Sequence, residues 1–230
     1  PGKITIIPCG FNPEEFYPVA REEARRALNL APHERIILQL GRIVPRKGID
    51  NVIRAAAMLR NTMDSLRLVV VGGESDDPDP VRTPELGRLQ RLASDEKVLD
   101  RVTFTGRCRR DMLKYYYGAA DVFITTPWYE PFGITPLEAM ACGVPVIGAN
   151  VGGIKYSVVD GKTGFLVPPN DPASLAQRIY LLLSNRKMLE RMKINALKRV
   201  HKYFTWQRVA QQMSGLYESV LPEKAAAAGF

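Results

Sequence analysis

The segment that decides the fold covers residues 122–147 and reads VFITTPWYEPFGITPLEAMACGVPVI. A short apolar run at 122–125 predicts a buried strand, and a second run at 144–147 predicts another. The helical pattern at 136–142 between them is typical of the crossover that connects two parallel strands. The segment therefore predicts one unit of a parallel α/β sheet.

The same alternation continues on both sides of this segment. Further buried strands are predicted at 36–40, 66–71 and 102–105, with helices at 47–60, 84–94 and 109–118. After a short extended piece at 164–167 the pattern becomes helical, at 172–183 behind an Asp171 cap, at 186–201 and at about 205–220. We expect an α/β fold, a Rossmann-like doubly wound parallel sheet followed by C-terminal helices.

The chain has 230 residues, 46% of them hydrophobic, which is enough to bury a full core in one large domain. We assign that domain to residues 19–221. Residues 1–18 contain Pro13 and Pro18 and are predicted to form an interdomain linker with an incoming strand at 4–8. Residues 222–230 carry no fold signal and are predicted to be a tail.

The net charge of +8 is concentrated in one segment. Residues 1–185 carry 23 basic and 21 acidic side chains, whereas residues 186–202 carry seven basic side chains and one acidic side chain, Glu190. Apolar residues recur there at helical spacing, so an amphipathic helix with a solvated basic face is the simplest interpretation. A weak contact of helix 186–202 with a membrane surface stays open. No nucleic-acid partner is expected, because aromatic side chains that could stack on bases do not alternate with these cations.

Cysteine usage and the first residues bear on the cellular compartment. Cys9, Cys108 and Cys142 are odd in number and far apart, which fits neither a disulfide framework nor a metal site. No apolar run approaches the roughly 18–20 residues that a membrane span needs, and the first residues lack the features of a secretory signal. We expect a cytoplasmic protein without a metal, with peripheral membrane association left open. A start without Met also suggests a fragment of a longer protein.

Glycine follows three of the predicted strands, at Gly41, at Gly72 with Gly73, and at Gly106. Glycine at a strand end lets a ligand approach the backbone closely. In open α/β sheets the ligand crevice lies outside the carboxyl ends of the strands, where these glycines would gather with Arg42, Lys47 and Arg107. Turn formation alone is the alternative explanation.

The loop at 127–135 leads into a helix start that could hold a phosphate. Thr135 is predicted as the N-cap, Pro136 as the first helical residue, and Glu138 as the partner of Thr135 in a capping box. The free N–H groups of a helix start attract a phosphate, and Gly133 leaves room for it. Glu130 and Glu138 would flank this phosphate, and carboxylates accept hydrogen bonds from the hydroxyls of a sugar and a ribose.

A group of cations lies between the first predicted strand and the helix after it. Residues 41–48 read GRIVPRKG, which is not the order of a nucleotide triphosphatase phosphate loop or of a dinucleotide fingerprint. Any diphosphate charge must therefore be met by side chains such as Arg42 and Lys47, which could stabilise the charge that develops on a leaving group. Salt bridges to surface acids are the alternative role.

Glu130 and Glu138 form a Glu-x7-Glu arrangement with Phe-Gly between them and AMACGVPVI after them. In this arrangement the sequence resembles the retaining group 1 glycosyltransferases of family 4, which have the GT-B fold of two facing Rossmann-like domains. Further matching motifs lie at 6–18, 41–48, 102–106, 120–121, 152–153 and 160–167. The resemblance covers nearly the whole chain and implies the C-terminal, donor-binding half of such an enzyme.

The resemblance implies a role for each charged residue of the candidate site. Arg42 and Lys47 would hold the donor diphosphate, Glu130 would bind hydroxyls of the donor sugar, and Glu138 would bind the ribose hydroxyls. Catalysis, with retention at the anomeric carbon, would rest on Glu130, Arg42 and Lys47. Arg107 would contact the base of the nucleotide, mostly through its backbone.

The resemblance also implies contacts through the backbone around Phe132, Gly133, Ile134 and Thr135, which would bind the phosphate and the sugar. No cofactor is expected, since the nucleoside-diphosphate sugar is the donor substrate, and the resemblance implies a reaction without an essential metal. A UDP or GDP type is favoured, and the residues alone leave uracil, guanine and adenine open.

A GT-B enzyme needs an amino-terminal domain with the acceptor site and a frequent catalytic His, and this domain has no counterpart here. His33 and His201 lie outside every motif and do not replace that His. We therefore expect the chain to bind a donor and to transfer little sugar alone. Two other functions stay open, a nucleotide-sugar-binding regulatory module without catalysis and a glycosidase that uses the two carboxylates as acid and nucleophile.

Overall fold

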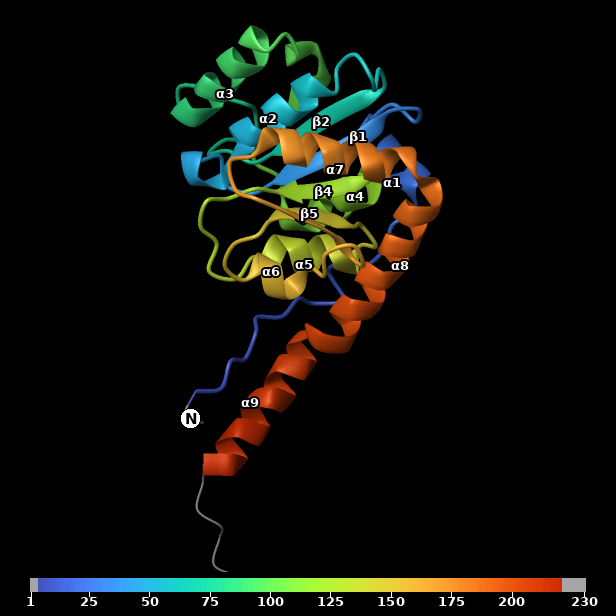
Figure 1. Cartoon of the computed structure of the whole chain (residues 1–230). Coiled ribbons are helices and arrows are strands. Elements are labelled where there is room, and N and C mark those ends of the chain that lie inside the picture. The colour runs from blue at the N-terminus through green and yellow to red at the C-terminus, as the bar shows by residue number, and fades with distance from the viewer. Residues whose placement is uncertain (1–3, 221–230) are drawn as a thin grey trace, which may run out of the picture.

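The computed structural model describes residues 4–220 and contains a six-stranded sheet (Figure 1). Its strands are β1 (Arg35–Leu40), β2 (Leu66–Val71), β3 (Val102–Phe104), β4 (Val122–Thr125), β5 (Val146–Ala149) and β6 (Gly164–Val167). They lie in the order β3-β2-β1-β4-β5-β6, and every neighbouring pair is parallel. This order confirms the predicted doubly wound, Rossmann-like sheet.

Helices cover both faces of the sheet and bury two hydrophobic cores. On one face lie α2 (Ile49–Met58), α3 (Pro84–Asp95) and α7 (Pro172–Ser184), represented in the core by Val52, Leu89 and Ile179. On the other face lie α1 (Arg21–Ala27), α4 (Leu113–Ala119) and α5 (Ile134–Ala141). α8 (Arg186–Tyr203) contributes to both cores, with Met192 in the first and Val200 in the second.

The strand order places the topological switch point between β1 and β4. β1 pairs with β2 on one side and with β4 on the other. The loop after β1 leads to α2 on one face, and the loop after β4 leads to α5 on the opposite face. Ligands of open α/β sheets bind where two such loops diverge, so this edge is the place for a site.

Several predicted elements need correction. β5 begins at Val146 and not at residue 144, because the Val144 N–H still bonds to the Ala139 carbonyl (2.9 Å) in the turn that ends α5. The helix predicted at 109–118 is a 3₁₀ turn at Arg110–Met112 followed by α4. The short helices α1 and α6 (Ile154–Ser157) were not predicted.

The predicted incoming strand at 4–8 is also wrong, since residues 4–10 adopt no strand. An isolated bridge pairs Phe11 with Thr205 instead, and the Phe11 N–H donates to the Phe204 carbonyl (2.9 Å). Residues 12–18 then run beside α4, where Phe16 packs against Tyr117 and Tyr17 accepts a hydrogen bond from Lys114, before α1 begins. Residues 1–3 and the predicted tail at 222–230 lie outside the described residues.

The C-terminal helices are as predicted from their spacing. Asp171 caps α7 by accepting a hydrogen bond from the Ser174 N–H (2.9 Å), which confirms the predicted cap. Asn185 caps α8 in the same way through the Met188 N–H (3.0 Å). α9 (Trp206–Val220) continues past the sheet (Figure 1), and Val209 is its one buried residue.

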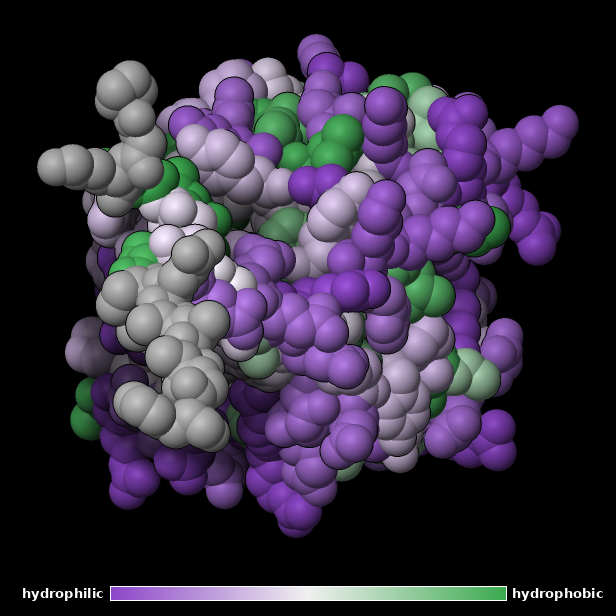
Figure 2. All heavy atoms as spheres, turned by 90° about the horizontal axis from the view of Figure 1, so that it is seen from below, coloured by the Kyte–Doolittle hydropathy of each residue, from purple (hydrophilic) through white to green (hydrophobic). Residues whose placement is uncertain are grey.

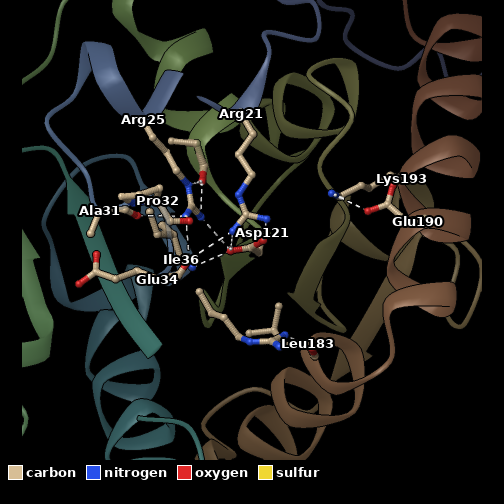
Figure 3. A network of polar contacts seen from close by, with 12 residues as sticks. Arg21, Arg25, Ala31, Pro32, Glu34, Ile36, Asp121, Leu183, Glu190 and Lys193 are labelled. Atoms are coloured by element: carbon tan, nitrogen blue, oxygen red, sulfur yellow. Dashed lines mark hydrogen bonds and ion pairs between the residues drawn. The ribbon is translucent and has the colours of Figure 1, made fainter. Parts of the chain in front are cut away.

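A buried ionic network ties α1 to the sheet (Figure 3). The Asp121 carboxylate accepts a hydrogen bond from the Ile36 N–H (2.8 Å) and pairs with Arg25 (3.1 Å) and Arg21 (2.9 Å). Arg25 is 2% exposed, and its burial lowers the pKa of the guanidinium while Asp121 opposes that shift. Because this network lies at the amino ends of β1 and β4, opposite the switch-point loops, its role is structural.

The basic segment forms a helix with a charged outer face, as predicted. Exposed cations recur along α8 at Lys187, Arg191, Lys198 and Lys202. Within residues 4–220 no helix is long and apolar enough to cross a membrane. The face in Figure 2 is covered mostly by hydrophilic side chains, with apolar groups in small separate patches. Contact between α8 and a membrane surface stays a prediction.

Candidate functional site

Two loops meet at the switch point and are joined through their backbones. The loop after β1 contains a 3₁₀ turn at Pro45–Lys47, and a Cβ at Gly48 would lie 2.1 Å from the Thr126 carbonyl oxygen in the loop after β4. The Thr126 hydroxyl donates to the Gly48 carbonyl (2.9 Å), and the Trp128 N–H donates to the Arg46 carbonyl (3.0 Å). Glycine at position 48 is therefore required for the two loops to approach this closely.

This contact brings together Lys47 and Glu130, which are far apart in the sequence. Lys47 Nζ donates to Glu130 Oε2 over 2.6 Å, and the two side chains are only 16% and 15% exposed. Arg46 approaches the same oxygen at 3.9 Å and donates to the Tyr129 carbonyl (3.2 Å). Glu130 is therefore not a solvated loop acid, and it neutralises part of the positive charge of the loop after β1.

The helix start next to this pair differs from the predicted capping box. Gly133, with φ +89°, is the N-cap of α5, the helix begins at Ile134, and Thr135 lies inside the first turn. Among the described residues no side chain caps this end, and the Glu138 carboxylate accepts a hydrogen bond from Tyr117 instead. The predicted box is wrong because the left-handed conformation of Gly133 ends the loop before Thr135 can act as a cap. The free N–H groups of the first turn remain available for an anion.

Glu138 is buried beneath the site. The residue is 5% exposed, and its Oε2 accepts a hydrogen bond from the Tyr117 hydroxyl (3.0 Å). Its Oε1 lies 3.9 Å from Arg110 Nη1, and Arg110 in turn pairs with Glu15 (2.5 Å) in the linker. Burial raises the pKa of Glu138, while the Tyr117 hydrogen bond and Arg110 oppose that shift. This burial disfavours the glycosidase alternative, since an acid or nucleophile must reach the scissile bond.

A separate pocket of about 220 Å³ lies at the carboxyl ends of β1 and β2. Its lining residues are Leu40, Gly41, Arg42, Val71, Gly72, Gly73, Arg107, Cys108 and Leu113. A Cβ at Gly41 would meet open space, whereas one at Gly72 would lie 2.0 Å from the Gly41 carbonyl oxygen. Gly72 therefore serves the packing of the two strand ends, and Gly41 leaves the mouth of the pocket open.

The two predicted arginines lie at this pocket in different states. Arg42 is exposed and forms no ion pair within residues 4–220. Arg107 pairs with Asp76 (3.1 Å), and its N–H donates to the Ser75 carbonyl (2.7 Å). The acidic loop at 74–79 thus folds over Arg107, and a backbone contact from Arg107 to a base would have to use its carbonyl oxygen.

The loop with the predicted backbone positions at 132–135 packs against two glycines, Gly152 and Gly153, which the sequence marked only as part of the family resemblance. A Cβ at Gly152 would lie 1.7 Å from the Glu130 carbonyl oxygen, and one at Gly153 would lie 2.2 Å from the Phe132 carbonyl oxygen. The Gly153 N–H donates to the Glu130 carbonyl (3.2 Å). Gly152 and Gly153 therefore support the loop that carries Glu130 and Phe132.

Comparison with known proteins identifies the family. The family described as glycosyl transferases group 1 matches residues 20–199. The chain belongs to the group 1 glycosyltransferases. Its fold is that of the C-terminal half of GT-B enzymes, as the resemblance implies.

Three similar proteins show the extent of the similarity. A D-inositol 3-phosphate glycosyltransferase of Acidothermus cellulolyticus is 37% identical over 99% of this chain and 50% of its own length. A sucrose-phosphate synthase structure from Thermosynechococcus elongatus is 40% identical, with a TM-score of 0.83 over 96% of this chain and 53% of that one. The Anabaena protein HepE in complex with UDP-glucose is 25% identical, with a TM-score of 0.80 over 94% and 57%.

The chain thus spans about half the length of the curated relatives it matches. In the part of the chain that the structure describes, no group of three His, Cys, Asp or Glu side chains is placed to hold a metal ion. A metal-independent reaction stays a prediction.

Proposed function

We propose that this chain binds a nucleoside-diphosphate sugar and supplies the donor half of a retaining hexosyl transfer. The observation that carries the proposal is the placement of Lys47 and Glu130 beside the open first turn of α5, at the switch point of the sheet. A cation, a helix N-terminus and a carboxylate at one point suit a diphosphate linked to a sugar.

We propose for each residue the role that the family resemblance implies, and its position supports that role. Arg42 is exposed at the mouth of the pocket and Lys47 lies beside α5, so both would contact the diphosphate and stabilise the charge on the departing nucleotide. Glu130 would accept hydrogen bonds from sugar hydroxyls, with backbone contacts from Phe132 to Thr135. Arg107 and the glycine-lined pocket would receive the base, and Glu138 would read the ribose.

Binding of the donor requires an exchange of partners. Lys47 cannot give its full charge to a phosphate while its ammonium is 2.6 Å from Glu130 Oε2. We propose that the diphosphate draws Lys47 away and that Glu130 then turns to the sugar. The unliganded protein would thereby keep both charges satisfied in a partly buried position.

A uridine nucleotide is the first candidate donor. The Anabaena protein with UDP-glucose bound shares the fold over most of this chain, and it is similar enough to suggest the same ligand class. GDP is the second candidate. The hexose and its acceptor are not specified by the residues at the site.

Transfer would require a second domain that binds the acceptor. The exposed α9 carries an apolar stripe of Val209, Met213, Leu216 and Val220, of which Val209 is the buried member. Ile4 and Ile6 in the linker are 87% and 83% exposed. We propose that these apolar residues pack against the acceptor domain, and that the chain alone therefore transfers little sugar.

A thermal unfolding screen tests the proposal. UDP, GDP and ADP, each with its sugar conjugates, are added to the wild-type chain, to Arg42→Ala and to Arg186→Ala, a control on the exposed face of α8. Ligand at about 100 times its dissociation constant adds about 2.7 kcal/mol, or roughly 5–10 °C for a domain of this size. A shift with one base that is lost in Arg42→Ala and kept in Arg186→Ala supports the proposal, and no shift with any nucleotide contradicts it.

The alternative of a regulatory module without catalysis makes a different prediction. The intact protein would then lose nucleotide binding in Arg42→Ala while any transfer reaction in which it takes part continues. Loss of transfer together with binding favours the enzyme.

A further inference from the structure

Among the fully buried side chains, Tyr117 is the largest, and it carries a hydroxyl group. It belongs to α4 and is 0% exposed. Its ring is held by edge contacts with Phe16 (centroids 6.1 Å apart) and Phe123 (5.5 Å). The hydroxyl therefore has a fixed position, from which it donates a hydrogen bond to Glu138 Oε2 (3.0 Å).

The two oxygens of Glu138 face different surroundings. Oε2 is occupied by the Tyr117 hydroxyl inside the core, whereas Oε1 lies 3.9 Å from the guanidinium of the largely exposed Arg110. Arg110 follows the loop at the carboxyl end of β3, on the ligand edge of the sheet. One oxygen is thus held from within, and the other points toward the side from which a nucleotide would arrive.

We infer that Tyr117 is a positioning residue for ribose recognition, which holds Glu138 Oε2 so that Oε1 alone is offered to a ribose hydroxyl. This inference rests on the proposed function, in which Glu138 reads the ribose. Without the Tyr117 hydroxyl the Glu138 carboxylate could adopt several orientations. Its hydrogen bond to the ribose hydroxyl would then weaken. Tyr117 would touch no part of the ligand itself.

The chemistry of the pair favours such a role over a purely structural one. A carboxylate in a core is unfavourable unless it is hydrogen-bonded, and replacing both partners of a buried hydrogen bond by apolar groups of the same shape can be nearly neutral for stability. Burial raises the pKa of Tyr117 well above its usual range, so the phenol stays protonated and serves as a constant donor. Glu138 is also faced by Arg110, by Glu15 beyond it and by the buried Cys142 thiol.

The test compares two ligands that differ only in the groups that Glu138 would read. Affinities for UDP and for 2′,3′-dideoxy-UDP, or for the GDP pair if only GDP binds, are measured for wild type, Tyr117→Phe and Tyr115→Phe. Tyr115 lies on the same helix and is not fully buried, so it controls for the loss of a phenol from α4. Tyr117→Phe should weaken UDP binding about 10-fold, because the charge-assisted contact between Glu138 and the ribose hydroxyl is lost. Binding of dideoxy-UDP, which lacks that hydroxyl, should be unchanged. Tyr115→Phe should change neither affinity.

Equal weakening of both ligands in Tyr117→Phe would overturn the inference, because a structural defect does not distinguish a ribose from its deoxy form. Glu138→Ala separates the inference from the proposed function. If Glu138→Ala removes the preference for UDP and Tyr117→Phe keeps it, the ribose role stands and the positioning role fails. If wild type binds both ligands equally well, the ribose role of Glu138 fails. If wild type binds no nucleotide, the proposed function fails.

A crystal structure of the wild-type chain with UDP gives a second test that does not depend on the folding of a variant. The expected complex keeps the Tyr117 hydroxyl on Glu138 Oε2 and places a ribose hydroxyl on Oε1. A ribose hydroxyl on Oε2, or a carboxylate that has left Tyr117, would overturn the inference.

Discussion

Lys47 Nζ and Glu130 Oε2 lie 2.6 Å apart and join the loop after β1 to the loop after β4 at the switch point of the sheet. The pair brings the cation assigned to the diphosphate into direct contact with the carboxylate assigned to the sugar. Each side chain therefore limits what the other can bind, and in the proposed function the donor separates them.

Glu130→Gln should separate the two parts of donor binding. The neutral amide releases Lys47, so UDP should bind as well as before or a few-fold more tightly. The additional affinity of UDP-glucose over UDP should fall by about 10-fold, because a charge-assisted bond to the sugar becomes a neutral one. Isothermal titration calorimetry with both ligands measures this. A fall in UDP affinity as large as the fall for UDP-glucose would refute the assignment of Glu130 to the sugar.

Gly133→Ala should destabilise the chain and disturb the helix start. A side chain at φ +89° is strained, which corresponds to about 1–2 kcal/mol of unfolding free energy. The matched control is Gly215→Ala inside α9, where a Cβ meets nothing within 4 Å and the substitution should be neutral or slightly stabilising. Urea denaturation of both variants measures the difference. A Gly133→Ala variant as stable as wild type would show that the left-handed N-cap is not required.

Acidification should remove the preference for UDP over dideoxy-UDP at a pH above the range in which an ordinary glutamate is protonated. Burial raises the pKa of Glu138, so the ionised form that we propose accepts ribose hydroxyls is lost as the pH falls through a value above the usual 4.5. The ratio of UDP to dideoxy-UDP affinity, measured from pH 7.5 downward, should fall toward one in that range. Taking the ratio cancels the protonation of the phosphates, which both ligands share. A ratio that stays constant down to the ordinary glutamate pKa would contradict this account.

Asp121→Asn should weaken folding and leave nucleotide recognition intact. The substitution leaves the buried Arg25 without its counter-ion, which costs about 3–5 kcal/mol of unfolding free energy. Asp64→Asn, at a 96% exposed side chain, should change the unfolding free energy little. Denaturant titration gives both values. The UDP affinity of the folded Asp121→Asn protein should equal that of wild type, and a selective loss of affinity would show that the network also serves the site.

The fold could be predicted because its signals are local. Apolar runs set the strands, and glycine, proline and Asp171 mark their ends and the start of α7. Errors arose where a neighbouring residue changed the local outcome. Thr135 has the sequence features of a cap, but the left-handed Gly133, two residues earlier, is the N-cap of α5. The short helices α1 and α6 are too brief to show a clear period.

The site could be predicted only as a set of candidate residues. Lys47 and Glu130 are 83 positions apart, and Tyr117 and Glu138 are 21 apart, so neither contact has a local signal. Both depend on the order in which the strands join the sheet. Tyr117 was missed because a tyrosine in an apolar helix is indistinguishable, in sequence, from any other core aromatic residue.

The most direct test of the central claim is the calorimetric titration of this chain with UDP-glucose, compared between wild type, Lys47→Ala and the surface control Arg186→Ala. We expect saturable binding by wild type and by the control, with affinity reduced roughly 10- to 100-fold in Lys47→Ala, because one charge-assisted contact to the diphosphate is lost. Equal affinity in wild type and Lys47→Ala would contradict the proposal that the switch-point loops hold the donor diphosphate.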